Sequence, residues 1–145
     1  MLLKDSRTIK KELANKGFIL TTISGNSMKP LLDDKKDSVY IEPLSKPLKR
    51  GDVILYERAS KQLVLHRIVK IRSNTYYVSG DNQYSLERVK KNQVLGIMTA
   101  YYKKENKKEL NRFIYTLYKF FIKLTRPYRY IKLKWNQRQK TRINT

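Results

Sequence analysis

The fold is constrained most by a series of short sequence segments with β-strand character, separated by turn residues, in the first two thirds of the chain. At least five strands are predicted from runs rich in β-branched and aromatic residues: FILTTIS (18–24), SVYIEPL (38–44), GDVILYER (51–58), LVLHRIVKI (63–71), TYYVSGDN (75–82) and NQVLGIMTAYY (92–102). Most links between them are short, and the link ASKQ predicts a hairpin. This pattern predicts a small, mostly β domain that closes near residue 103.

One helix is predicted before the first strand, capped by Asp5 or Ser6 and ended by Gly17, with Ile9 and Leu13 on its apolar face. The N-terminal segment MLLKDSRTIKKEL is charged from its fourth residue onward, which is typical of neither a secretory signal nor a membrane span. Because this segment does not resemble a targeting signal, we expect a cytoplasmic location. The sequence does not determine on which side of the membrane the protein acts. No cysteine is present, which excludes disulfides and thiolate metal sites.

The charge of the chain is large and uneven. The 33 Lys and Arg outnumber the 12 Asp and Glu, giving a net charge of +21, and residues 101–145 hold 14 of the basic residues with only two acids. Such a balance indicates an anionic partner surface. We therefore expect two parts, a domain over residues 1–103 and a basic, aromatic-rich tail over 104–145.

Within the tail, residues 111–124 place Lys and Arg on one helical stripe and aromatic and aliphatic residues opposite, and Pro127 ends the pattern. This amphipathic helix is too short to span a bilayer, so three functions compete for it. It can lie in the interface of an anionic membrane, which we favour; it can pack on the β domain; or it can bind nucleic acid.

Ser27 and His66 are the candidate catalytic residues. Ser27 follows a predicted strand in the loop ISGNSMKPLL, where its hydroxyl either caps a turn or is displayed for chemistry. A serine needs a base to become a nucleophile. His66 is the single histidine, and strand alternation puts it between Val64 and Ile68, where partial desolvation keeps the imidazole neutral. A histidine base predicts activity that rises with pH through an apparent pKa of about 6 to 7.

Four blocks in a fixed order resemble type I signal peptidases and their relatives, the self-cleaving LexA-type repressors. They span about residues 18–102 and are Ser27-Met28-Lys29-Pro30, Gly51-Asp52-Val53, His66-Arg67-Ile68 and Gly80-Asp81-Asn82. The resemblance implies a serine endopeptidase that cleaves signal or leader segments, without cofactor or metal. In these families a membrane anchor or a DNA-binding domain usually precedes the serine block, and from the residues ahead of Ser27 we expect neither here.

The resemblance also implies roles for single residues. Ser27 matches the nucleophile, and His66 stands where common bacterial signal peptidases have a lysine, as in the endoplasmic reticulum and archaeal branch. The acid that orients the histidine would be Glu87, with Asp81 the other candidate. The Ser27 N–H is the expected oxyanion donor. Lys70 shares the face of His66 but lies about 13 Å along the strand, so we favour His66 as the base.

The function expected is therefore that of a membrane-associated serine endopeptidase with a Ser27–His66 pair, acting on peptide or protein substrates. The alternative is a catalytically idle β domain that binds nucleic acid or another anionic surface through its tail.

Overall fold

The computed structural model describes residues 5–103 and 106–110, together with Phe120, Leu124, Pro127, Tyr128 and Ile131. Its elements are α1 (Ser6–Lys16), β1 (Ile19–Thr22), β2 (Ser38–Glu42), β3 (Val53–Glu57), β4 (Leu63–Arg72), β5 (Thr75–Ser79), β6 (Glu87–Lys90), the short 3₁₀ helix η1 (Lys91–Gln93), β7 (Val94–Lys103) and β8 (Asn106–Glu109). The prediction of a mostly β fold with one N-terminal helix is confirmed.

The helix α1 begins and ends where its capping residues predict. The Asp5 carboxylate accepts a hydrogen bond from the Thr8 N–H at 2.7 Å, which satisfies a donor of the first turn. Gly17 adopts a left-handed conformation with φ of 75°, and its N–H donates to the Leu13 carbonyl. Ile9 and Leu13 are buried, and the helix contacts β1 and β7. The helix therefore covers one face of the sheet.

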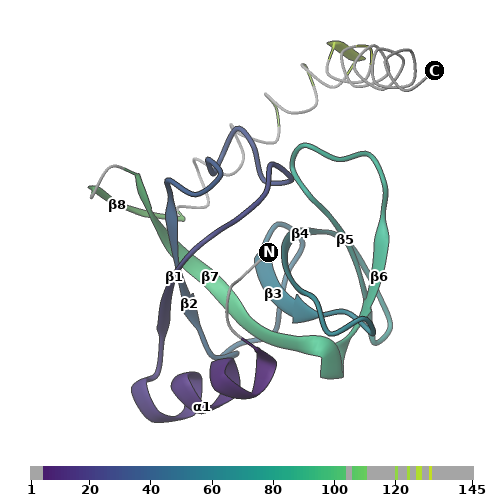
Figure 1. The fold of residues 1–145 in the computed structure, drawn as a ribbon. Helices are drawn as coiled ribbons and strands as arrows, with labels where there is room; N and C mark the ends of the chain where they lie inside the picture. Colours follow the sequence, from purple (N-terminus) through teal and green to yellow (C-terminus); the bar gives the residue numbers. More distant parts are fainter. Residues whose placement is uncertain are drawn as a thin grey trace, which may run out of the picture. The chain divides into compact units, whose positions relative to one another are not determined.

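All strands join one antiparallel sheet that curls around itself (Figure 1). The strand order is β1-β2-β7-β3-β4-β5-β6, and β8 pairs with β7. Strands β6 and β8 were not predicted, because β6 buries a single side chain and β8 buries none. Neither has the apolar alternation that marks a strand in the sequence.

Strands β3 and β4 are buried on both faces, which explains their nearly continuous apolar sequence. One face belongs to the main core, which consists of Ile9, Leu13, Ile19, Ile23, Met28, Leu32, Val39, Ile41, Val53, Leu55, Leu63, Leu65 and Met98. The other face belongs to a second cluster inside the curl, which consists of Ile54, Tyr56, Val64, Ile68, Val78 and Val89. By alternation, His66 lies on the face of this second cluster, as expected from its neighbours Val64 and Ile68.

The chain divides into two compact units, Met1–Leu110 and Asn111–Thr145. Strand β8 belongs to the first unit, which thus extends past the boundary expected at residue 103. The amphipathic helix predicted over residues 111–124 lies almost wholly outside the described residues. In the part of the chain that is described, no helix is long and apolar enough to cross a membrane.

Candidate active site

Ser27 lies in the loop between β1 and β2, and buried neighbours anchor this loop. Met28 and Leu32 belong to the main core, and the Leu32 N–H donates to the Met28 carbonyl at 3.0 Å. On the other side of Ser27, the Gly25 N–H donates to the Asp34 carboxylate at 2.8 Å. Ser27 itself is half-buried, and no described residue forms a hydrogen bond with its hydroxyl or its N–H.

The loop that follows β5 touches Ser27 directly. The Asn82 N–H donates to the Ser27 carbonyl at 2.7 Å. A Cβ atom added to Gly80 would lie 2.6 Å from that carbonyl oxygen and 2.9 Å from the Ser27 Cβ. Such distances are shorter than van der Waals contact, so only glycine allows the two loops to approach this closely.

The same glycine relates Ser27 to His66. Arg67 with Ser79 is the last pair between β4 and β5, and the same antiparallel register continued by one residue would set Gly80 opposite His66. Directly opposite residues share a face of the sheet, with Cβ positions about 4.5–5.5 Å apart. Because the Ser27 carbonyl oxygen and Cβ lie where a Gly80 side chain would be, this register would bring Ser27 toward the face of β4 that carries His66. Among the described contacts, no hydrogen bond joins their side chains, and such bonds are often longer before substrate binds.

His66 is 3% exposed, and its Nδ1 lies 3.1 Å from the Tyr56 hydroxyl. Burial penalises the imidazolium and lowers the pKa of His66 to about 4, below the 6 to 7 expected from the sequence. No described residue bonds the other ring nitrogen, Nε2.

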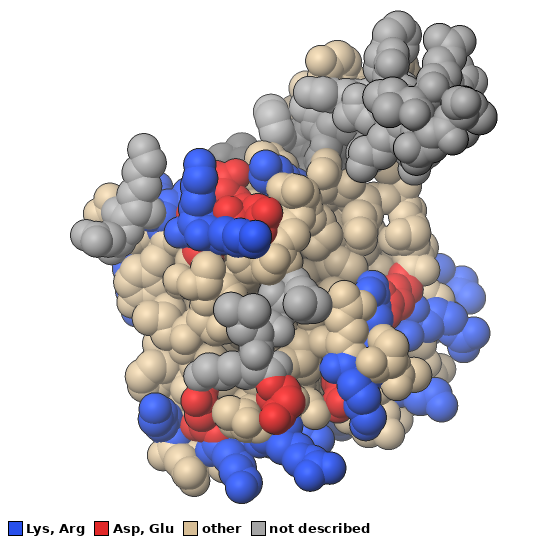
Figure 2. Space-filling model, in the orientation of Figure 1, with Lys and Arg blue, Asp and Glu red and all other residues tan. Residues whose placement is uncertain are grey.

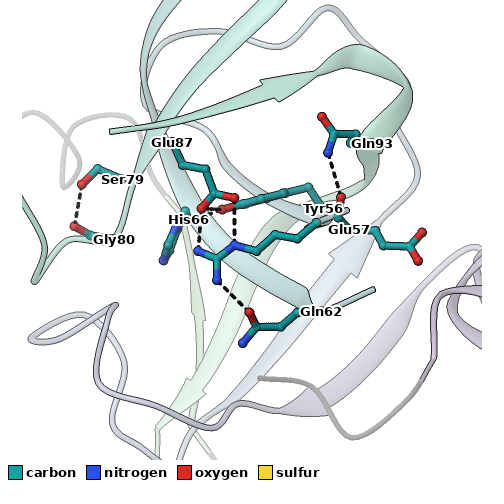
Figure 3. A network of polar contacts seen from close by, with 9 residues as sticks. Tyr56, Glu57, Gln62, His66, Ser79, Gly80, Glu87 and Gln93 are labelled. Carbon is teal, nitrogen blue, oxygen red and sulfur yellow. Dashed lines mark hydrogen bonds and ion pairs between the residues drawn. The ribbon is translucent and has the colours of Figure 1, made fainter. Parts of the chain in front are cut away.

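Glu87, at the start of β6, connects to His66 through Tyr56 (Figure 3). The Tyr56 hydroxyl donates to Glu87 Oε2 at 2.7 Å, and the Arg58 guanidinium binds both carboxylate oxygens. The hydrogen bonds from Arg58 hold the pKa of the Glu87 carboxyl below its usual range. No direct hydrogen bond between Glu87 and His66 is found among the described contacts.

Asp81 occupies a different environment, because it forms a buried bidentate pair with Arg67. Arg67 Nε and Nη2 donate to the two Asp81 oxygens at 2.8 and 2.7 Å, and Nη1 donates to the Gly51 carbonyl at 2.9 Å. Arg67 and His66 are adjacent in β4, so their side chains lie on opposite faces. Asp81 therefore fixes the loop that touches Ser27, on the side of the sheet away from the imidazole.

The remaining candidate base, Lys70, is exposed near the far end of β4, where it pairs with Tyr77. Sequence reasoning missed Tyr56 and Arg58. The available signal was alternation along β3, which places Ile54, Tyr56 and Arg58 on one side. A buried tyrosine hydroxyl needs a polar partner, but the sequence did not show which one.

In comparisons with known proteins, neither a family model nor a curated protein sequence matches this chain. The interpretation of the site therefore depends on its geometry and on the order of the four blocks.

Proposed function

We propose that this chain is a serine endopeptidase of the signal-peptidase type, with Ser27 as nucleophile and His66 as general base. The observation that carries the proposal is the close approach of Ser27 to Gly80, the residue that follows the β5 partner of Arg67, while the Ser27 hydroxyl and N–H have no partner among the described residues. A serine that only capped a turn would use its hydroxyl in a local hydrogen bond.

The proposed reaction follows from these positions. His66 Nε2 takes the proton of the Ser27 hydroxyl while Oγ attacks the scissile carbonyl, and the Ser27 N–H stabilises the oxyanion. Collapse of the tetrahedral intermediate breaks the C–N bond, and the imidazolium returns the proton to the leaving amine. Water, deprotonated by the same imidazole, then attacks the acyl-enzyme; the bond between the acyl carbon and Ser27 Oγ breaks, and the imidazolium returns its proton to Oγ as the free acid is released. Because Asp81 is bonded to Arg67 while Glu87 is connected to the imidazole through Tyr56, the proposal gives the acid role to Glu87.

The substrate in this proposal is an extended signal or leader segment. Strand β1 is an end of the described sheet, and it leads into the loop that carries Ser27. A peptide that adds to its free edge would gain main-chain hydrogen bonds and pass toward Ser27. Strand addition also holds the scissile bond in the extended form that attack by a serine requires.

The partner of the basic tail is, in the same proposal, an anionic membrane surface. On the face of the molecule shown in Figure 2, Lys and Arg are spread around the edge and interspersed with Asp and Glu, so the described unit shows no single basic patch there. In this proposal the excess positive charge of residues 101–145 attracts the chain to the anionic lipid. The attraction is worth about 1 kcal/mol for each basic residue near the lipid. Binding of the full chain to anionic vesicles, and its release by salt, would test this.

A fluorophosphonate probe on the full chain tests the nucleophile. We expect one adduct, on Ser27, that Ser27→Ala abolishes and that Ser24→Ala, as a matched control in the same loop, retains. Absence of any adduct, or equal labelling of the Ser27→Ala variant, would refute the peptidase. Salt-sensitive RNA binding without labelling would favour the alternative, a nucleic-acid-binding domain.

A further inference from the structure

We propose that Tyr56 is a positioning residue that links Glu87 to His66 and thereby fixes the histidine tautomer with its base at Nε2. The proposal deepens the proposed peptidase function and depends on it for its consequence in catalysis. The direction of the hydrogen bonds, however, can be tested without measuring catalytic activity.

Glu87 determines the direction of the hydrogen bonds. The Arg58 guanidinium donates to both Glu87 oxygens, Nε to Oε1 at 2.8 Å and Nη2 to Oε2. A carboxylate held in this way is ionised and can only accept hydrogen bonds. The Tyr56 oxygen lies 2.7 Å from Oε2, so the single phenolic proton must point to Glu87.

The single proton of the Tyr56 hydroxyl determines which nitrogen of His66 is protonated. Tyr56 has one O–H, and Glu87 receives it, so toward the histidine the phenolic oxygen can only accept. The contact of 3.1 Å between this oxygen and Nδ1 then requires that Nδ1 carry the proton. In a neutral imidazole with Nδ1 protonated, Nε2 holds the free lone pair. This is the nitrogen that no described residue bonds, and it would receive the serine proton.

Burial makes this arrangement stable. Tyr56 is fully buried, and the ring of His66 lies 6.0 Å from its ring at a tilt of 54°. Ile54 pairs with His66 and Tyr56 pairs with Val64, so the tyrosine reaches the histidine diagonally across β3 and β4. Water cannot replace either partner of a hydroxyl buried in this way. Desolvation and the adjacent Glu87 also raise the pKa of Tyr56 far above its usual value, so the phenol keeps its proton.

The arrangement also explains how an acid that does not touch the histidine can act on it. When His66 becomes an imidazolium, its Nδ1–H donates more strongly to the Tyr56 oxygen, and the phenol in turn donates more strongly to the Glu87 carboxylate. Negative charge at Glu87 thus stabilises the cation through one intervening hydroxyl. The sequence predicted an acid that orients the histidine, but not the intervening hydroxyl.

The test uses the fact that His66 is the only histidine of the chain. In full-length protein with ¹⁵N-labelled histidine, long-range ¹H–¹⁵N spectra at pH 7.5 report one imidazole, and we expect the pattern of protonated Nδ1 and unprotonated Nε2. Tyr56→Phe should shift the ring toward the Nε2-protonated tautomer and lower kcat for peptide cleavage by at least about 10-fold with little change in KM. Tyr76→Phe is the matched control, because Tyr76 packs on the same cluster and its hydroxyl has no hydrogen bond among the described contacts.

If Tyr56→Phe does not fold, Glu87→Gln serves as the second variant, since it removes the ionised acceptor and frees the phenolic proton to turn toward Nδ1. An Nε2-protonated histidine in the unmodified protein would overturn the proposal. So would a tautomer and a kcat that change in neither variant. If the tautomer behaves as expected but no peptide is cleaved and no probe labels Ser27, the hydrogen-bond order stands and the peptidase function fails.

Discussion

Two arginine–carboxylate pairs lie close to the candidate site, one on each side of β4, and they differ in burial. In the Arg67–Asp81 pair the side chains are 7% and 3% exposed, whereas in the Arg58–Glu87 pair they are 33% and 30% exposed. The buried pair joins the loop after β5 to the start of β3 through the Gly51 carbonyl. The half-exposed pair leads through Tyr56 to the imidazole.

From this difference we infer that Asp81 stabilises the structure and that Glu87 serves the proposed chemistry. A buried ion pair costs much to break, because the remaining charge loses both water and its partner. A pair near the surface contributes little to stability. Its role therefore depends on the other groups that it contacts. We therefore expect changes at Asp81 to affect folding and changes at Glu87 to affect rate.

The largest effect is expected from Asp81→Ala. This change leaves the Arg67 guanidinium buried with only part of its hydrogen bonds, and it should lower the free energy of unfolding by about 3–5 kcal/mol. Urea denaturation of the full chain measures it. Glu87→Ala is the control and should cost no more than about 1 kcal/mol. Equal losses in the two variants would remove the distinction between the pairs.

The next effect is expected at the contact between the two loops. Gly80→Ala places a methyl group where the Ser27 carbonyl and Cβ now lie, so Ser27 must move away from His66. The rate of fluorophosphonate labelling should fall by about 10²-fold, since small displacements of a reacting group cost this much. Ser79→Ala, one residue away, should label nearly normally. Normal labelling of Gly80→Ala would show that the close approach of the two loops does not position the nucleophile.

Stability should depend on pH through His66. Its pKa is about 4 in the folded chain, against about 6.5 when unfolded. Because the folded pKa is the lower one, the unfolded state binds the proton first as the pH falls, and stability is lost below about pH 6.5. Between pH 7.5 and 5 the loss should be about 2 kcal/mol.

The control for this pH dependence is His66→Gln, whose stability should vary much less over the same range. The pKa of Glu87 is lowered from 4.5, so its contribution is retained at pH 5 and above and does not obscure the result. An unchanged pH dependence in His66→Gln would mean that other groups titrate in this range.

The smallest effect is expected from Glu87→Gln. The amide keeps the shape of the side chain but removes the charge that stabilises the imidazolium, so the rate of acylation should fall by about 10-fold. Stability should change by less than about 1 kcal/mol, as measured by urea denaturation. A large loss of stability with an unchanged rate would make this pair structural as well.

Much of this fold could be predicted from the sequence, because capping residues mark α1 and apolar alternation marks the longer strands. Strand β6 could not, since ERVK buries only Val89 and its place is determined by pairing with β5. The same limit applies to the site. Ser27 and His66 were proposed from their blocks, but the contact of Glu87 with Tyr56 depends on that β5–β6 register. The pairing of Asp81 with Arg67 could not be predicted either, because Arg67 and its neighbour His66 in β4 point to opposite faces.

The most direct test of the central claim, that His66 activates Ser27, is the rate at which a fluorophosphonate probe modifies Ser27 in the unmodified chain and in His66→Ala. Mass spectrometry locates the adduct, and far-ultraviolet circular dichroism confirms that the variant is folded. We predict modification confined to Ser27 and a rate at least about 10²-fold lower in His66→Ala. A folded His66→Ala variant that reacts as fast as the unmodified chain would contradict the account.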